Sequence, residues 1–180
     1  MNRIAPLCAL MMGLLAASAY AQPTAAPPAA AAPAAATCVP AKTVDQLAKA
    51  LDDAISGPRD KDRTCLRKLF VPEARMTPIR KEQDGSFAPR MLTVDDWINA
   101  VRGHAGAPFY EHQVKVKSET YGHFAHLWST YEIRPTPDGK PEAIGINSIQ
   151  AVFDGSRWRV LSVLWESDAT AGPVPKEYLP

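Results

Sequence analysis

The chain has 180 residues, with 20 basic and 19 acidic side chains and a formal net charge of +1 at pH 7. Arg3 is the only charged residue before Lys42, so the rest of the chain is electrically balanced. A balanced domain lacks the strong basic field that nucleic-acid binders and polybasic membrane anchors use. About 143 residues follow the alanine-rich start, which is enough for one domain with its own core.

The N-terminal residues divide into two parts that we do not expect to join the fold. Residues 1–21 combine a basic start, an apolar stretch and the small-residue ending Ala19-Tyr20-Ala21, which predicts a secretory signal peptide cleaved near Ala21. Residues 22–37 carry no charge and are rich in proline and alanine, which predicts a disordered tether. No other segment has 18 uncharged apolar residues, so we expect an exported protein, periplasmic or secreted, with no membrane span.

Export leaves two cysteines, Cys38 and Cys65, in an oxidising compartment, where such a pair most simply forms a disulfide. In the chain-entropy model, closing a loop of this length contributes roughly 3 to 4 kcal/mol to stability. The alternative is a redox or metal-binding thiol pair, which has neither a CxxC spacing nor nearby histidines to support it.

Helical signals are confined to the first half of the remaining chain. The capping box Thr43-Val44-Asp45-Gln46 opens a helix that Gly57-Pro58 ends, and Thr93 caps another helix that ends at Gly103. Between them we expect a short helix and then a proline-bearing segment with an Asp84-Gly85 turn, read as an irregular hairpin at a sheet edge. In chain order these elements are residues 44–55, 62–70, 74–92 and 94–103.

After Pro108 the hydrophobic period changes to two, which predicts strands. Four strands joined by short turns form an antiparallel meander. With helices first and strands after, the order predicts an α+β fold in which three N-terminal helices pack on one face of a curved sheet. The four strands cover residues 110–117, 124–134, 142–153 and 158–166.

The turns predict which residues share a face of this sheet. Two-residue turns at 121–122 and 154–155 and a symmetric loop around Asp138 fix the pairing. On the face that the helices cover, they place two polar rows and a polar end: His112 with Tyr131 and Gly145, Ser129 with Asn147 and Ser162, and Tyr110 with Glu166.

His112 and Tyr131 are the candidate catalytic residues, because an imidazole beside a phenol can act as a general acid-base pair. The alternative is a half-buried histidine that is hydrogen-bonded to tyrosine for structure alone. Gly145, which lacks a side chain, leaves room for a ligand beside them. Tyr110, Ser129, Asn147, Ser162 and Glu166 are candidate ligand-binding residues, although the three mid-face residues can instead pair with one another and a strand-end glutamate can be solvated.

The opposite face has a charged rim around an apolar centre, and such a centre is usually covered. We expect a homodimer through this face. The alternative is that Ser167–Pro180 folds back over part of it. The candidate dimer residues are Trp128, Ile146, Leu161, Val163 and Trp165.

Motifs for metals and cofactors are missing from the sequence, which leads us to expect neither. His123 and His126 are three apart on a strand and therefore face opposite ways, so they cannot chelate one metal. There is also no glycine-rich phosphate loop and no GxSxG elbow.

Several stretches resemble the nuclear-transport-factor-2-like superfamily, and in particular an exported branch of its SnoaL-like members. The likeness covers roughly residues 44–168. It is carried by Leu69-Phe70-Val71-Pro72-Glu73-Ala74-Arg75, by His126-Leu127-Trp128-Ser129-Thr130-Tyr131-Glu132, by Gly145-Ile146-Asn147-Ser148-Ile149-Gln150 and by Asp154-Gly155-Ser156-Arg157-Trp158-Arg159-Val160.

This resemblance implies a cone-shaped, cystatin-like domain with a pocket between helices and concave sheet, and pairing of two copies through their sheets. The superfamily contains isomerases, dehydratases, epoxide hydrolases and cyclases beside domains that only bind. The first predicted helix has no tyrosine, unlike ketosteroid-isomerase-like members, so no mechanism is carried over.

Three hypotheses follow for a domain spanning residues 38–168 with a C-terminal tail at 169–180. The leading one is an exported domain that binds a small apolar molecule in its cone, with His112, Tyr131 and Asn147 as polar anchors. The second is a cofactor-free lyase or isomerase that uses His112 as base and Tyr131 as electrophile. The third is a protein-interaction module that uses the convex sheet face.

Overall fold

The computed structural model describes residues 37–104 and 107–180, which belong to one compact unit, Ala35–Pro180. The predicted signal peptide and the predicted tether up to residue 36 lie outside the described residues. In the described part of the chain, no helix is long and apolar enough to cross a membrane. The elements are α1 (Val44–Ile55), α2 (Thr64–Leu69), β1 (Phe70–Lys81), β2 (Phe87–Pro89), α3 (Val94–Gly103), β3 (Tyr110–Tyr121), β4 (Phe124–Arg134), β5 (Ala143–Phe153), β6 (Trp158–Ser167), α4 (Asp168–Ala171) and a 3-10 turn, η1 (Lys176–Tyr178).

The fold is α+β, with one curved six-stranded sheet in the order β2-β1-β6-β5-β4-β3. The meander β3 to β6 is antiparallel as expected, but β1 pairs with β6 in parallel. The expectation of an irregular edge hairpin at 74–92 was therefore wrong for β1, which is a full strand inside the sheet. The prolines of this segment, Pro78 and Pro89, suggested a sheet edge, yet Pro78 lies within β1 and pairs with Trp165 of β6.

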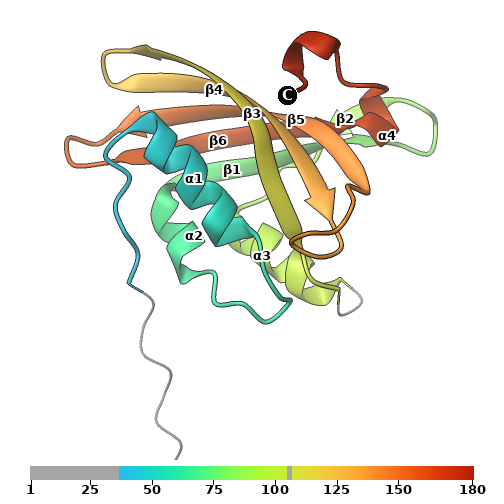
Figure 1. Ribbon diagram of the computed structural model, residues 1–180, viewed down its shortest axis with the longest axis horizontal. Helices are drawn as coiled ribbons and strands as arrows, with labels where there is room; N and C mark the ends of the chain where they lie inside the picture. Colours follow the sequence, from blue (N-terminus) through green and yellow to red (C-terminus); the bar gives the residue numbers. More distant parts are fainter. Residues whose placement is uncertain (1–36, 105–106) are drawn as a thin grey trace, which may run out of the picture. The chain divides into compact units, whose positions relative to one another are not determined.

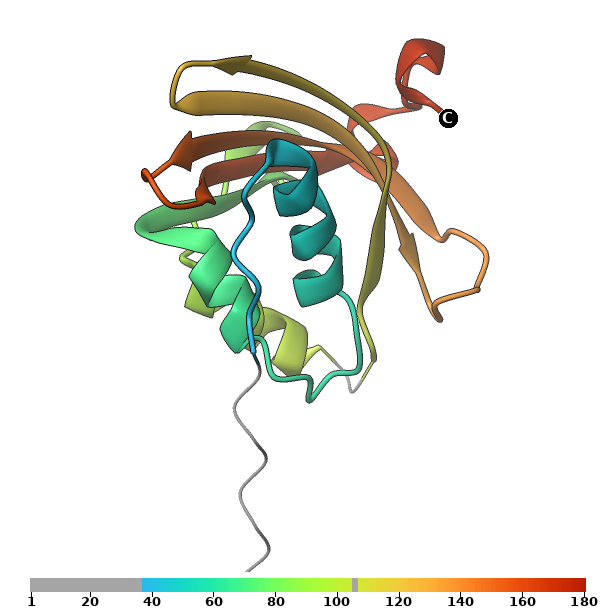
Figure 2. The ribbon, with the colours of Figure 1, turned by 60° about the vertical axis from the view of Figure 1, so that its left-hand side comes forward.

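Helices α1, α2 and α3 all lie on one side of the sheet, and the C-terminal segment lies on the other (Figures 1 and 2). The Thr43 hydroxyl caps α1, and Thr93 and Asp96 form a complete capping box on α3. Each helix turns an apolar stripe to the concave face of the sheet, where burial of each large side chain contributes about 1.5 to 3 kcal/mol. The core is formed by helix residues Leu47, Leu51, Ile55, Leu66, Leu69, Trp97 and Ile98 against strand residues Phe70, Met76, Leu127, Ile149, Val160 and Val163.

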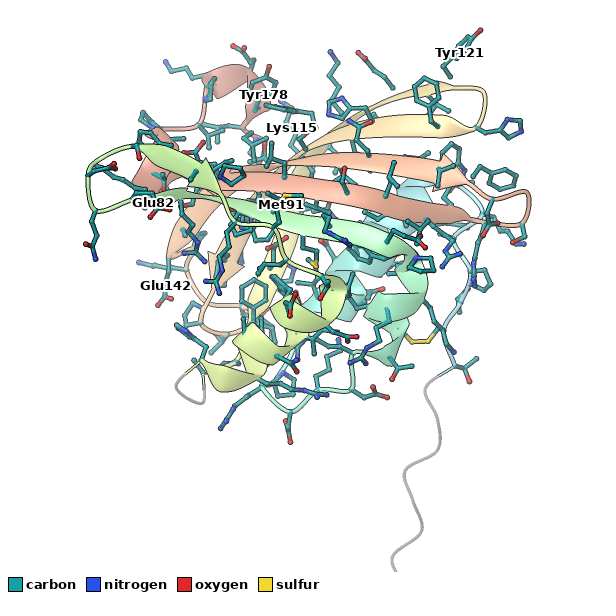
Figure 3. The ribbon with its side chains drawn as sticks, turned by 180° about the vertical axis from the view of Figure 1, so that it is seen from behind. Glu82, Met91, Lys115, Tyr121, Glu142 and Tyr178 are labelled. Atoms are coloured by element: carbon teal, nitrogen blue, oxygen red, sulfur yellow. A yellow bond between two sulfur atoms is a disulfide. The ribbon has the colours of Figure 1, made fainter. Side chains whose placement is uncertain are left out.

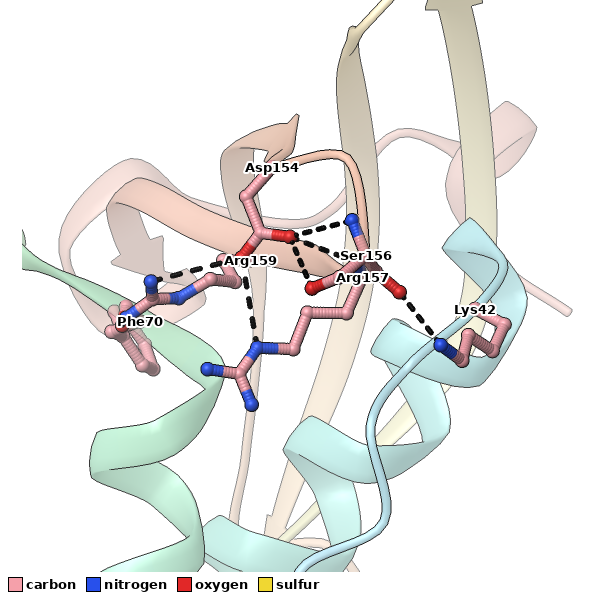
Figure 4. Close-up of polar contacts among 6 residues, drawn as sticks. All are labelled: Lys42, Phe70, Asp154, Ser156, Arg157 and Arg159. Carbon is pink, nitrogen blue, oxygen red and sulfur yellow. Dashed lines mark hydrogen bonds and ion pairs between the residues drawn. The ribbon is translucent and has the colours of Figure 1, made fainter.

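The segment before α1 is tied to the rest of the domain in two ways. Cys38 and Cys65 form the predicted disulfide, with an S–S distance of 2.05 Å, which joins this segment to α2. Lys42 Nζ donates to the carbonyl of Ser156 at 2.8 Å in the β5–β6 loop, which Asp154 organises through hydrogen bonds from Ser156 (Figure 4). Those hydrogen bonds hold the pKa of Asp154 down at about 2. Arg159 extends this network by donating to the carbonyl of Phe70 at 2.7 Å.

The predicted register is correct between β4 and β5, where Tyr131 lies opposite Gly145 and Ser129 lies opposite Asn147. It is wrong at the two outer pairings of the meander. One extra residue on β3, Val114, interrupts the pairing with β4. On the N-terminal side of this bulge, the side chains of residues 110–113 lie on the opposite face of the sheet from the one predicted, because side chains alternate along a strand.

A second bulge has the same effect on β6. The pairs Ala151–Val160 and Gln150–Ser162 leave Leu161 as an extra residue on β6. From there on, Val163 and Trp165 lie opposite Ile149 and Asn147, on the concave face. The sequence prediction had placed both on the convex face, and this was wrong.

Candidate functional site

A cavity of about 310 Å³ lies between the helices and the concave face of the sheet. Most of its wall is apolar, and a few polar side chains converge on it from β3, β4 and β5. This is the usual composition of a small-molecule site. Its apolar lining includes Leu51, Ile55, Phe70, Met76, Pro78, Trp97, Phe109, Ile133, Ala143, Ile149, Val163 and Trp165, and its polar lining includes Arg80, Glu111, Gln113, Tyr131, Asn147, Glu166, Ser167 and Thr170.

Glu111 enters this cavity because the β3 bulge turns it inward, opposite Ile133. Its backbone is fixed by the last turn of α1: its N–H donates to Ser56 Oγ at 2.8 Å, and Ser56 Oγ donates to its carbonyl at 2.6 Å. Its side chain accepts a hydrogen bond at 3.2 Å from Asn147 Nδ2 on β5. Both the main chain and the carboxyl group of Glu111 are therefore held in place.

The electrostatic setting of Glu111 favours its protonated form. Burial raises the pKa of this carboxyl, the hydrogen bond from Asn147 lowers it and the charge of Asp52 raises it, and together they bring it to about 7. Glu111 retains some accessible surface because it borders the cavity, not bulk solvent. Near neutral pH this group is thus present both as carboxylate and as carboxylic acid, which is the condition for exchanging a proton with a ligand.

A polar network next to Glu111 connects α1 to the bulge. The backbone N–H of Gln113 donates to the Asp52 carboxylate at 3.1 and 3.2 Å, and Gln113 Nε2 donates to Asp52 Oδ1 at 2.9 Å. Gln113 Oε1 accepts from Ser129 Oγ at 2.7 Å. Burial raises the pKa of Asp52, and the hydrogen bonds from Gln113 lower it. Ser129 is therefore engaged within the protein.

Tyr131 is 2 % exposed and lies against Gly145, directly across the β4–β5 pair. A Cβ on Gly145 would lie 2.5 Å from Tyr131 Oη and 2.6 Å from Cζ, so the phenol occupies the space that the glycine leaves. The expectation that this space is free for a ligand was wrong. Burial, together with the charges of Glu111, Asp168 and Glu166, raises the pKa of Tyr131 above its ordinary value, so the phenol stays protonated at neutral pH.

Three residues predicted for the cavity face lie elsewhere. His112 pairs with Glu132 and Tyr110 pairs with Arg134, so the bulge places both on the convex side of β3. His112 Nε2 is buried without a hydrogen-bond partner in the described part of the chain. Ser162 is turned outward by the β6 bulge and pairs with Gln150. The placement of His112 beside Tyr131, on which the acid-base pair depended, was wrong.

Of the other predicted ligand-binding residues, Asn147 and Tyr131 line the cavity, and Ser129 lies beneath it. Glu166 lies opposite Ile146 in the register and borders the cavity at its end. Sequence reasoning missed Glu111, Gln113 and Asp52. Asp52 carried one usable signal, because a carboxylate beside Leu51 and Ile55 on the apolar stripe of α1 needs a polar partner. Within residues 37–104 and 107–180, no three His, Cys, Asp or Glu residues are arranged to hold a metal ion.

The C-terminal segment covers part of the convex face. The ring of Tyr178 packs on Trp128 at 5.8 Å between centroids, Thr130 Oγ1 donates to the Tyr178 carbonyl at 2.6 Å, and Lys115 Nζ donates to the Leu179 carbonyl at 2.7 Å. Figure 3 shows Tyr178 and Lys115 close together on this side of the sheet. Leu161 and Leu164 remain exposed. The fold-back of the tail, which the sequence left as an alternative, is thus present.

Comparisons with known proteins give relatives by fold alone. No family model matches the sequence, and no curated protein matches it. A solved structure from Nostoc punctiforme, described as a protein of unknown function with a cystatin-like fold, has a TM-score of 0.52 and 10% identity over 71% of this chain and 95% of that one. An NTF2-like protein of unknown function from Pseudomonas putida has a TM-score of 0.52 and 13% identity over 76% of this chain and 89% of that one.

Proposed function

Because the chain has the nuclear-transport-factor-2-like fold, we propose that its cavity binds a small, largely apolar molecule carrying a polar oxygen. Glu111, Asn147 and Tyr131 are the polar anchors. The observation that carries this proposal is the Glu111–Asn147 pair, held at 3.2 Å inside a mostly apolar cavity of about 310 Å³.

The energetic argument concerns the cost of placing a carboxyl group there. A buried carboxyl group without full hydrogen bonding costs stability, and an apolar side chain at this position would pack better. Ser56 and Asn147 nevertheless hold Glu111 at the cavity wall. A ligand hydroxyl or carbonyl would supply the missing hydrogen bond, since the carboxylic acid form donates and the carboxylate form accepts.

Displacement of a neutral fluorescent probe tests this proposal. N-phenyl-1-naphthylamine should bind in the cavity, and decan-2-one should displace it. Glu111→Met, which keeps the length of the side chain but can neither donate nor accept this hydrogen bond, should weaken the binding of decan-2-one while leaving that of the probe within about twofold. Glu119→Met, the same change at an exposed position of the same strand, is the matched control. A probe that does not bind, or that binds equally when Ala143→Phe fills the cavity, would refute the proposal.

A second candidate function is proton transfer, as in a cofactor-free isomerase or lyase, favoured by the pKa of about 7 at Glu111. Here Glu111 takes the role that the sequence assigned to His112. Its carboxylate removes a proton from the carbon beside a ligand carbonyl, and the N–H of Asn147 or the hydroxyl of Tyr131 donates a hydrogen bond to the oxygen that gains charge. The proton then returns to carbon from the carboxylic acid.

Deuterium exchange separates binding from this chemistry. If Glu111 acts as a base, the protein in D₂O should exchange the hydrogens beside the carbonyl of decan-2-one, as followed by proton NMR, and Glu111→Gln should abolish the exchange. Binding without exchange leaves the first function alone.

Location and assembly belong to the same proposal. Export is supported by the signal-like residues 1–21 and by the disulfide of Cys38 with Cys65. The surface proposed for a homodimer, or for another protein partner, is the part of the convex face that the tail leaves open around Leu161 and Leu164. Light scattering at micromolar concentration tests this, and a monomer would refute it.

A further inference from the structure

Arg80 is a cation at the opening of the cavity. It lies on β1 two residues beyond Pro78, which pairs with Trp165, so Arg80 shares the concave face with Trp165. The residue is exposed and at the same time lines the cavity, which places it at an opening. Among the described lining residues it is the one cation, and its guanidinium forms no hydrogen bond or ion pair with any other residue of 37–104 and 107–180.

Two hydroxyl groups accompany this guanidinium. Because β1 and β6 are parallel, extending the pair Pro78–Trp165 by two residues on each strand brings Arg80 beside Ser167. Ser167 precedes α4 without capping it through its side chain, and Thr170 follows within α4. All three residues line the cavity. This end of the cavity therefore presents two hydroxyl groups and a positive charge, next to the carboxyl group of Glu166.

We propose that the natural ligand is an elongated organic acid whose carboxylate binds Arg80, Ser167 and Thr170, while its far end carries the oxygen that meets Glu111 and Asn147. The proposal rests on the proposed binding function of the cavity. It names the class of ligand and assigns Arg80 as the residue that determines specificity for the acid.

A carboxylate fits this end better than a phosphate does. The planar fork of one arginine matches the two oxygens of a carboxylate. Glu111 and Glu166 also line the cavity, so a second negative charge on the ligand would meet like charges that a single arginine does not offset. A monoanion with an apolar body satisfies both conditions.

The sheet sets the length of this acid. Arg80 is on β1 and Glu111 is on β3, separated by β6, β5 and β4. Four spacings of about 4.8 Å put the two backbones roughly 19 Å apart along the sheet, and the curvature of the sheet shortens the direct distance. Both side chains reach inward from the two ends, so the ligand that joins them needs on the order of ten carbon atoms when extended.

A pair of probes that differ only in the head group, one charged and one neutral, tests the assignment. Both 10-hydroxydecanoate and 10-hydroxydecanamide are titrated as competitors of N-phenyl-1-naphthylamine. The wild-type protein should bind the acid about tenfold more tightly than the amide. Arg80→Gln should lower the affinity for the acid to that for the amide, and Arg80→Lys should keep most of the preference for the acid. Arg90→Gln, at an exposed arginine outside the cavity, should change neither affinity.

The outcomes separate this inference from the proposed function. If the amide displaces the probe but the acid does no better, or if Arg80→Gln leaves the preference for the acid intact, the assignment of Arg80 is overturned while the cavity still binds. If neither compound nor the probe binds, the proposed function and the inference both fall.

Discussion

The phenol of Tyr131 occupies the space that Gly145 leaves by having no side chain, directly across the β4–β5 pair. This relationship fixes the position of the ring beneath the cavity, at the level where Glu111, Gln113 and Asn147 meet. A hydroxyl whose pKa is raised and that is held in this way is a hydrogen-bond donor of defined position.

Gly145→Ala should therefore be destabilising. The added Cβ would lie 2.5 Å from Tyr131 Oη and would also press on the carbonyl oxygen of Glu166, so the ring must move. Overpacking of this kind costs about 1 to 3 kcal/mol, measurable by urea denaturation. Gly103→Ala is the control, because its Cβ would meet nothing within 4 Å. Equal stability of the two variants would contradict the observed packing.

Glu111→Gln should change the pH dependence of stability. The folded-state pKa of Glu111 is about 7 and its ordinary value is 4.5, so the folded protein holds this proton more tightly than the unfolded chain does. The free energy of unfolding that this group supports thus falls as pH rises from about 4.5 to 7, by up to about 3 kcal/mol. The variant cannot titrate and should gain on the wild type across this range.

Denaturation of both proteins at pH 4, 6 and 8 measures this difference, with Glu119→Gln as control. If the difference between Glu111→Gln and wild type stays constant with pH, the raised pKa of Glu111 is refuted. Asp52, whose pKa is also raised by burial, is present in both proteins, and because its charge raises the pKa of Glu111 the difference reports on the two groups together.

The sequence predicted the α+β class, the meander and the pairing of β4 with β5, because alternation and tight turns are local signals. It did not predict the two bulges. Val114 and Leu161 are ordinary strand residues. At Val114 the bulge is accompanied by tertiary contacts, because Asp52 of α1 and Ser56 at its C-terminal end accept hydrogen bonds from backbone N–H groups of β3. Each bulge exchanged the faces of its strand, which removed His112 from the site and brought Glu111 and Trp165 into it.

Loss of the disulfide should cost the domain much of its stability. Cys38 and Cys65 are separated by 27 residues, and the chain-entropy model assigns such a loop roughly 3 to 4 kcal/mol. The double variant Cys38→Ala/Cys65→Ala should unfold at correspondingly lower urea concentration, and wild type in excess reductant should approach it. A reductant that leaves the wild-type midpoint unchanged would contradict this account.

Removal of the Tyr178 ring should loosen the C-terminal segment from the convex face. The ring packs on Trp128, and a contact of this kind contributes about 0.5 to 1.5 kcal/mol beyond burial. Tyr178→Ala should therefore increase acrylamide quenching of tryptophan fluorescence. Tyr121→Ala, at an exposed tyrosine away from the tail, should leave quenching unchanged. Identical quenching in both variants would argue against the tail as a cover in solution.

Carboxyl ¹³C NMR of the glutamate-labelled protein, recorded during titration with decan-2-one, tests the central claim most directly. Binding at Glu111 and Asn147 predicts that the Glu111 signal, assigned by its loss in Glu111→Gln, titrates with a pKa of about 7 and shifts to saturation as the ketone is added. The exposed Glu119 signal should not respond to the ketone. A Glu111 signal that titrates near 4.5 and is unmoved by ketone would contradict the claim.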